Sequence, residues 1–301
     1  MSHISSTQDN TQAVDRLPLR PTMLAVLAHP DDETFGIGGT LAYYAWCGAA
    51  VHLICATGGE LGEMGPIYMQ GYSSVAERRQ AELDGAARAL GLSGVTMLGY
   101  RDSGMPDQES NRHPQALAAQ PIEVVTARVV AEIRRLRPQV VITFDPIGGY
   151  RHPDHIAIQQ ATVAAFAAAS DPARFPEAGP PHRAQRLYFH TFSRSFLRAV
   201  VAVMPLLGRD PARFGRNHDV DLAALAKITF PIHARIDCLP VAQRQAIASG
   251  CHASQGEGSQ LMRGSLGALF RLLGGHETFM QAEPQPEPGY RVSDLFAGVE
   301  W

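Results

Sequence analysis

Short apolar runs recur along the first 200 residues and alternate with longer amphipathic stretches. Each run has the length of a buried strand and is bounded by residues typical of turns. Five runs predict strands, at residues 23–28, 51–56, 95–98, 140–144 (VVITF) and 186–192 (RLYFHTF). The segments between them are long enough to carry the chain back across a sheet as helices.

Helical periodicity is clearest in two of these connecting segments. One spans residues 73–92 and ends at Gly91, and the other spans 122–136 and is halted by Pro138. Their apolar faces consist of Leu83, Ala86, Ala87 and Leu90, and of Ile122, Val125, Val129, Ile133 and Leu136. Further helices are predicted around 40–47 and over 156–169. Alternating strands and helices predict an α/β fold, a Rossmann-like layered sheet that is mostly parallel and has helices on both faces.

The two ends of the chain carry a weaker pattern. Residues 1–20 are polar and predict a disordered N-terminal tail, and residues 21–301 predict a single domain with an irregular C-terminal portion. Within that portion we expect a strand at 228–237 and a helix at 239–253. The segments SDPARFPEAGPPHR and QAEPQPEPGY are predicted to be surface loops.

Composition narrows the possible partners. The chain has 301 residues, of which 45% are hydrophobic, and a net charge of −3, so nucleic acid is not expected as a partner. Its longest apolar stretch, 197–207, is broken by Arg198 and Pro205, and no membrane span is predicted. The four cysteines lack CxxC spacing and are expected to be reduced, with Cys47 and Cys55 buried, which favours the cytoplasm. The oligomeric state stays open.

Two polar clusters follow predicted strands. The first, His29 to Glu33, comes directly after the strand at 23–28, and the second, ending in HPDH at 152–155, follows the strand at 140–144. Parallel strands bring such clusters to the same edge of a sheet. Two histidines and an acid are a ligand set for catalytic zinc, whereas structural zinc usually has cysteine ligands. A simple turn or helix cap is the alternative for either cluster alone.

The sequences of these clusters, AHPDDE at 28–33 and HPDH at 152–155, resemble the LmbE/PIG-L family of metal-dependent de-N-acetylases. Further similar segments are RDSGM (101–105), the helix with Arg79 three residues before Glu82, CHASQ (251–255) and SDLFAG (293–298). The resemblance is greatest to the mycothiol-pathway branch, which contains an N-acetylglucosaminyl-inositol deacetylase and a conjugate amidase. Residues 169–219 depart from that pattern.

The resemblance implies a role for each matching residue. The zinc ligands, with iron as a possible replacement, are His29, Asp32 and His155. The catalytic residues are Asp31 as general base, His152 as a group that stabilises or protonates the tetrahedral species, Tyr150 as a mobile group that polarises the carbonyl, and Asp154 as the partner that orients His152. The sugar-binding residues are Arg79 and Asp102.

The implied activity is removal of the N-acetyl group from a small N-acetylglucosaminyl conjugate, such as one linked to inositol or malate. Two alternatives stay open: an amidase that cleaves a glucosaminyl thiol conjugate, and a sugar-binding homologue without turnover. GIGGT at 36–40 lacks the full GxGxxG spacing of a dinucleotide loop. Gly148 and Gly149 predict either a hinge for Tyr150 or a plain turn, and His252 lines the pocket only by its likeness to the family.

Overall fold

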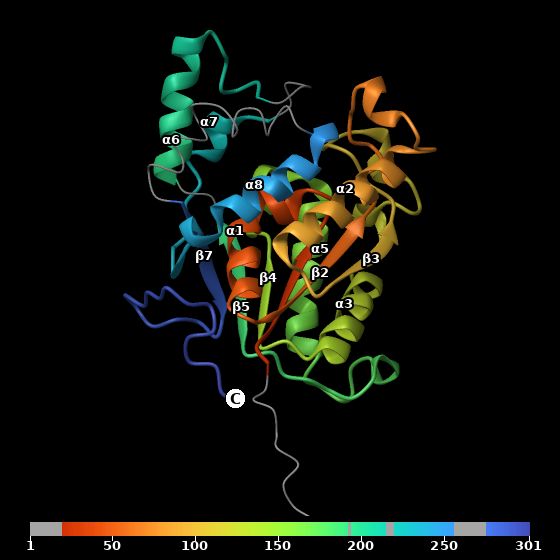
Figure 1. Cartoon of the computed structure of the whole chain (residues 1–301). Helices are drawn as coiled ribbons and strands as arrows, with labels where there is room; N and C mark the ends of the chain where they lie inside the picture. The colour runs from red at the N-terminus through yellow and green to blue at the C-terminus, as the bar shows by residue number, and fades with distance from the viewer. Residues whose placement is uncertain (1–19, 192–193, 215–219, 256–274) are drawn as a thin grey trace, which may run out of the picture.

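The structure is a computed structural model that describes residues 20–191, 194–214, 220–255 and 275–301. Apart from Arg20, the predicted tail lies outside the described residues. A seven-stranded sheet with the order β3-β2-β1-β4-β5-β7-β6 forms the centre of the fold (Figure 1). Its strands are β1 (Thr22–Leu27), β2 (Ala50–Thr57), β3 (Gly94–Tyr100), β4 (Val140–Thr143), β5 (Arg186–Thr191), β6 (Ala234–Asp237) and β7 (His276–Glu283).

The first five strands are those predicted from the apolar runs, and they pair with one another in parallel. β1 lies in the interior of the sheet, between β2 and β4, and its residues from Met23 to Leu27 are fully buried. Strands buried on both faces are continuously apolar rather than alternating, which explains the run that precedes His29. The predicted mostly parallel sheet is confirmed.

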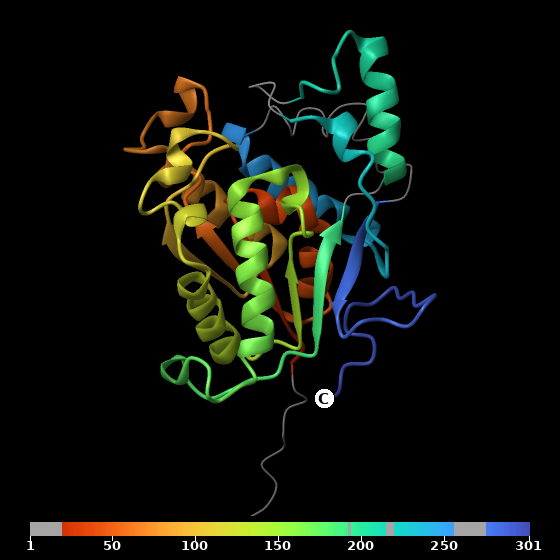
Figure 2. The same cartoon turned by 180° about the vertical axis from the view of Figure 1, so that it is seen from behind.

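Helices cover both faces of the sheet, as predicted. α1 (Asp32–Trp46), α2 (Val75–Leu90) and α8 (Ala242–Cys251) pack together on the face seen in Figure 1. α3 (Ile122–Leu136) and α5 (Pro153–Ala168) pack against each other on the opposite face, which is turned to the viewer in Figure 2. The shorter helices are α4 (Gly148–Arg151), α6 (Arg194–Val203) and α7 (Leu222–Leu225). Single 3₁₀ turns occupy Pro66–Met69, Glu109–Arg112, Leu117–Ala119, Pro176–Ala178, Met204–Leu207, Leu239–Val241 and Ala253–Gln255.

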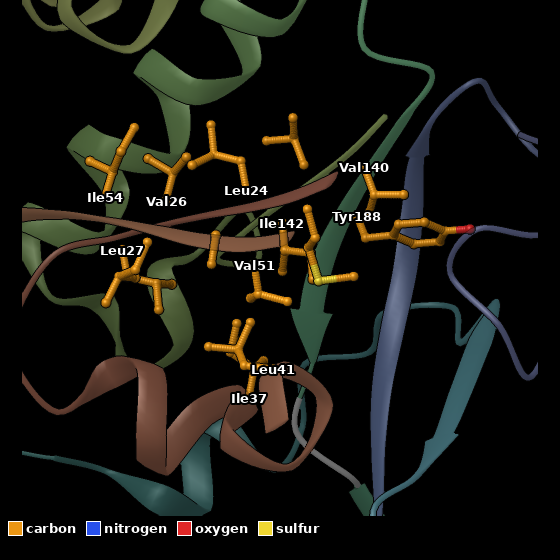
Figure 3. Packing of buried hydrophobic residues seen from close by; sticks show 14 of the residues in the cluster. Leu24, Val26, Leu27, Ile37, Leu41, Val51, Ile54, Val140, Ile142 and Tyr188 are labelled. Carbon is orange, nitrogen blue, oxygen red and sulfur yellow. The ribbon is translucent and has the colours of Figure 1, made fainter. Parts of the chain in front are cut away.

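The hydrophobic core lies between the sheet and these helices. Ile37 and Leu41 of α1 point toward the strands, close to Leu27 and Val51 (Figure 3). Each of these four side chains is fully buried, and burying a Leu or Ile side chain contributes about 1.5–3 kcal/mol. This packing holds α1, and with it the acidic residues of its first turn, in a fixed position at the end of β1.

The structure corrects the predicted start of α1. The sequence predicted a helix only around 40–47, but α1 begins at Asp32 and has a kink at Ile37, where φ is −140°. Gly36, Gly38 and Gly39 weaken the helical pattern on both sides of the kink. The N–H groups of Gly39 and Thr40 donate to the Glu277 carboxylate at 2.9 and 2.8 Å.

The C-terminal portion also differs from the prediction. β7 was missed, and it pairs antiparallel with both β5 and β6. The strand predicted at 228–237 is confined to Ala234–Asp237, and the loop predicted at 281–290 includes the last three residues of β7. The helix predicted at 239–253 is present as a 3₁₀ turn followed by α8.

The four cysteines are free thiols, as expected, but Cys47 is exposed rather than buried, because it follows the last turn of α1. Among the described residues, no helix is both long and apolar enough to cross a membrane.

Candidate metal centre and active site

The two polar clusters meet at the carboxyl ends of β1 and β4, which are neighbours in the sheet. The strand order reverses here, with β2 and β3 on one side and β5 on the other. Ligands of open α/β sheets bind at this kind of switch point. His29 and Asp32 lie between β1 and the first turn of α1, and His152 and His155 lie at the start of α5.

Donor atoms of three residues converge at this point. His29 Nδ1 lies 3.2 Å from His155 Nε2 and 3.5 Å from Asp32 Oδ2. His155 Nε2 lies 3.3 Å from Asp32 Oδ1. Ligand atoms bound about 2.0–2.2 Å from a tetrahedral zinc ion are roughly 3.3–3.6 Å apart. The observed separations therefore fit a small divalent cation, and the chemistry of the set suits zinc or iron.

The His155 ring is fixed so that its Nε2 faces the cluster. Its Nδ1–H donates to the Gly148 carbonyl at 3.1 Å, which leaves the lone pair on Nε2. The ring stacks on Phe144 with centroids 3.9 Å apart. Gly148 has φ +66°, and a Cβ atom there would lie 2.8 Å from the Cβ of His155. A glycine is therefore required where the chain passes this close to the histidine.

The His29 ring is held by Asp154. His29 Nε2–H donates to Asp154 Oδ2 at 3.1 Å, so the neutral ring has its lone pair on Nδ1, the atom that faces Asp32 and His155. Asp154 is fully buried, and its carboxylate also accepts the backbone N–H of Ser103 at 2.9 Å and the Ser103 hydroxyl. A carboxylate behind a ligating histidine commonly fixes the ring and raises its basicity.

Asp154 was expected to orient His152, and the structure gives its carboxylate different partners. Asp154 contacts His152 through its backbone instead. His152 is the N-cap residue of α5, and its Nδ1 accepts the Asp154 N–H at 3.2 Å. Since Nδ1 accepts, the proton of the neutral ring lies on Nε2. Burial, together with the neighbouring His29 and His155, lowers the pKa of His152, which favours this neutral ring.

Asp31 has an unusual backbone conformation at the N-cap of α1, with φ 131° and ψ −25°. Its carboxylate is 20% exposed and lies 3.0 Å from Arg79 Nη2. Burial raises the pKa of Asp31 to about 6, against the opposing charge of Arg79. The carboxylate is thus ionised at neutral pH but takes up a proton more readily than an ordinary aspartate.

Arg79 and Asp102, the expected sugar-binding residues, are both buried beside the cluster. Besides Asp31, Arg79 donates to the carbonyls of Pro30 and Gly59 at 2.6 and 2.8 Å. Asp102 accepts the N–H groups of Leu61 and Gly104 at 3.3 and 2.8 Å, and its Oδ1 lies 3.7 Å from His29 Nε2. Both side chains therefore hold the loops that border the site.

Tyr150 lies next to the histidines, on the short helix α4. Its ring centroid is 4.9 Å from that of His155 and 5.9 Å from that of His152. Burial raises the pKa of Tyr150 well above its ordinary value, so its hydroxyl keeps its proton. The Asp145 carboxylate accepts the N–H of Gly149 at 2.9 Å and ties this helix to the end of β4.

Three residues of the site make contacts that the sequence did not predict. Ser103 binds Asp154, and its only signal was its place in RDSGM. Glu33 and His252 are fully buried behind Asp31 and lie 2.7 Å apart. His252, which the likeness to the family places in the pocket lining, is held by Glu33 through its Nε2.

The sequence of the chain matches a known protein family and its members. The profile of the PIG-L family, described as GlcNAc-PI de-N-acetylase, matches residues 24–166, which include both polar clusters. The 1D-myo-inositol 2-acetamido-2-deoxy-alpha-D-glucopyranoside deacetylase of Streptomyces scabiei (strain 87.22) is 34% identical over 291 residues, covering 92% of this chain and 89% of the relative. The chain belongs to the PIG-L family.

Two solved structures share the fold of this chain. The conserved protein TT1542 from Thermus thermophilus has a TM-score of 0.59 and 24% identity, covering 90% of this chain and 99% of that one. The N,N'-diacetylchitobiose deacetylase from Pyrococcus horikoshii has a TM-score of 0.60 and 17% identity, covering 89% of this chain and 87% of that one. At these identities the likeness concerns the fold alone.

Proposed function

We propose that this PIG-L family member is a metal-dependent hydrolase that removes the N-acetyl group from a small N-acetylglucosaminyl conjugate, with an inositol conjugate as the leading candidate. The observation that carries the proposal is the convergence of His29, Asp32 and His155 donor atoms next to the Asp31 carboxylate. The relative from Streptomyces scabiei, named as a deacetylase of an inositol glycoside, supports the choice of substrate.

In this proposal His29, Asp32 and His155 hold one divalent cation, zinc or iron. When bound, such a cation lowers the pKa of water from 15.7 to about 7 and polarises a carbonyl oxygen. The chain contributes fixed lone pairs on His29 Nδ1 and His155 Nε2, because Asp154 and the Gly148 carbonyl occupy the other ring nitrogens.

Asp31 is proposed as the general base that takes a proton from the attacking water. Asp32 contacts both histidines, whereas Asp31 contacts Arg79, so the two neighbouring carboxylates point to different partners. A pKa of about 6 lets Asp31 accept a proton near neutral pH and then return it to the amine leaving group. A positioned base of this kind contributes roughly 10²- to 10⁴-fold to the rate.

His152 and Tyr150 are proposed to stabilise the tetrahedral species. The neutral His152 ring carries its proton on Nε2, because Nδ1 accepts the Asp154 N–H. It can therefore donate a hydrogen bond to the oxygen on which negative charge develops. Tyr150, which keeps its hydroxyl proton, is a second donor next to the histidines.

Arg79 and Asp102 are proposed to border the sugar. Arg79 is buried beside the metal ligands and binds the Asp31 carboxylate at 3.0 Å, so it lies at the border of the site. The loops that carry Gly59, Leu61 and Gly104 are held by these two side chains.

We further propose a cytoplasmic location and no nucleic-acid partner, in line with the net charge of −3 and the free cysteines.

Acetate release from a panel of compounds tests the proposed activity. The panel contains N-acetylglucosamine linked to inositol, the malate conjugate, free N-acetylglucosamine, an acyl-cysteinyl glucosaminyl-inositol and an acetyl-lysine peptide. We expect the inositol or malate conjugate to be hydrolysed fastest. Faster cleavage of the acyl-cysteinyl compound would favour an amidase, preference for the peptide would refute sugar specificity, and no turnover of any compound would refute an enzyme.

A further inference from the structure

The backbone of Asp31 has a conformation that must be held by contacts with the surrounding structure. Its φ of 131° lies in a region that L-residues rarely adopt. Non-glycine residues stay in such conformations only where the surrounding structure holds them. The direction of the Asp31 carboxylate depends on this backbone conformation, so whatever holds the backbone also aims the carboxylate.

The side chain of Glu33 provides this restraint. Its Oε2 accepts the backbone N–H of Asp31 at 2.9 Å, and its Oε1 accepts the Nε2–H of His252 at 2.7 Å and the Thr34 hydroxyl at 2.5 Å. Glu33 and His252 both have 0% exposure. One carboxylate oxygen is therefore committed to the Asp31 peptide, while the other is held by a histidine that lies 219 residues away in the sequence.

His252 is itself anchored by α2. Glu82 of α2 accepts the backbone N–H of Ser254 at 2.9 Å and the Ser254 hydroxyl at 2.6 Å, which fixes the turn that follows His252. Three residues earlier on the same helix, Arg79 binds the Asp31 carboxylate. α2 thus restrains Asp31 at two points: the side chain through Arg79 and the backbone through His252 and Glu33.

We propose that Glu33 and His252 form a positioning pair that sets the orientation of Asp31 without touching the substrate or the metal. This inference rests on the proposed role of Asp31 as the general base. Without the His252 donor, Glu33 Oε1 keeps only the Thr34 hydroxyl, so the carboxylate is held less firmly on the Asp31 N–H and the strained φ is less restrained. A misplacement of about 1 Å in a catalytic group can lower a rate roughly 10²-fold.

Two substitutions of the same histidine test the pair. In His252→Gln the side-chain amide nitrogen comes near the place of the imidazole Nε2 and can donate to Glu33, whereas the shorter side chain in His252→Asn cannot reach it. For His252→Asn we expect kcat for acetate release to fall roughly 10- to 100-fold, with KM within about twofold and metal content unchanged. His252→Gln should recover most of the loss. Equal kcat in the two variants, or a wild-type kcat in His252→Asn, would overturn the proposal.

Amide hydrogen exchange at Asp31 provides a readout that needs no substrate. Exchange of the Asp31 N–H should be slow in the wild-type protein and in His252→Gln, and at least about tenfold faster in His252→Asn. Glu33→Gln, whose amide cannot accept both N–H donors, is expected to behave like His252→Asn and replaces it if that variant does not fold. Unchanged exchange in a folded variant would refute the positioning role, whatever the activity of the wild type.

His182→Asn is the matched control. His182 is partly buried, bonds the Pro138 carbonyl at 2.8 Å, and lies in the connection that leads into the amino end of β5, away from the site. The same substitution there should leave both kcat and the exchange of Asp31 as in the wild type. If it changed them as much as His252→Asn, the effect would be a general loss of stability and the positioning role would be wrong.

Discussion

Replacing Arg79 with alanine removes the side chain that connects α2 to the candidate base. Arg79 is 4% exposed and makes three charge-assisted contacts, to Asp31 Oδ2 and to the carbonyls of Pro30 and Gly59. In Arg79→Ala both carbonyls lose the Arg79 N–H, with the Gly62 N–H left on Gly59, and the Asp31 carboxylate loses its cation. The ligands of the proposed metal centre are untouched, because none of them contacts Arg79 in the described hydrogen bonds and ion pairs.

The cost of this change can be worked from the three contacts. Hydrogen bonds to a charged group contribute about 1.5–3 kcal/mol each, and removing one partner of a buried ion pair costs about 3–5 kcal/mol. The contributions overlap, so we expect the free energy of unfolding to fall by roughly 3–5 kcal/mol. Because Arg79 lowers the pKa of Asp31, its loss should also raise that pKa above about 6.

Urea unfolding and the pH dependence of kcat/KM measure the two effects in the same variant. We expect lower kcat/KM at neutral pH, an acid limb displaced to higher pH and an unchanged metal content. Arg88→Ala, an exposed arginine in the last turn of the same helix, is the control and should change stability by no more than about 0.5 kcal/mol. A loss below about 1 kcal/mol in Arg79→Ala together with an unmoved acid limb would refute this account of Arg79.

Three further predictions concern the centre itself. Asp31→Asn should lower kcat by about 10²-fold or more while metal content, measured by elemental analysis, stays the same; loss of metal would show that the roles of Asp31 and Asp32 are exchanged. In the wild-type protein kcat/KM should fall as the pH drops through about 6, since Asp31 is then protonated and cannot act as a base, and a rate independent of pH from 5 to 8 would contradict this role. Ser103→Ala removes the hydroxyl that donates to Asp154 Oδ1, and it should weaken metal affinity by roughly 10-fold in a chelator competition. Unchanged affinity would show that Asp154 does not need the Ser103 hydroxyl to hold His29.

The parallel part of the sheet could be predicted because most of its strands, all but the edge strand β3, are largely buried. Continuous apolar runs such as Met23–Leu27 give a strong signal, and the amphipathic stripe of Ile122–Leu136 gives another. β7 could not be predicted in the same way, since HETFMQAE mixes polar and apolar residues without regular alternation. Its polar side chains make tertiary contacts instead, as Glu277 does with α1 and Thr278 with Thr191.

The candidate site was predictable to the extent that its residues follow strand ends. His29, Asp32 and His155 were expected at one edge of the sheet, and their donor atoms lie within 3.5 Å of each other. Contacts between side chains were harder to predict. The family resemblance assigned Asp154 to His152, but its carboxylate faces His29, 125 residues away.

The support behind Asp31 lay even further from local patterns. Glu33 looked like one more acid in a polar turn, and His252 lies in a separate segment after α8. Only the packing of α8 against α1 and α2 brings the two side chains together. Spacing in a sequence predicts which residues share an edge, whereas the partner of each buried polar atom depends on how the helices pack.

Metal content measured in parallel for four proteins tests the central claim most directly. We expect about one zinc or iron ion per chain in the wild-type protein and in Asp31→Asn, and almost none in His29→Ala and His155→Ala. Acetate release should be about 10²-fold or more lower in Asp31→Asn than in the wild type. Full metal content in both histidine variants would contradict the assignment of His29, Asp32 and His155 as the metal centre.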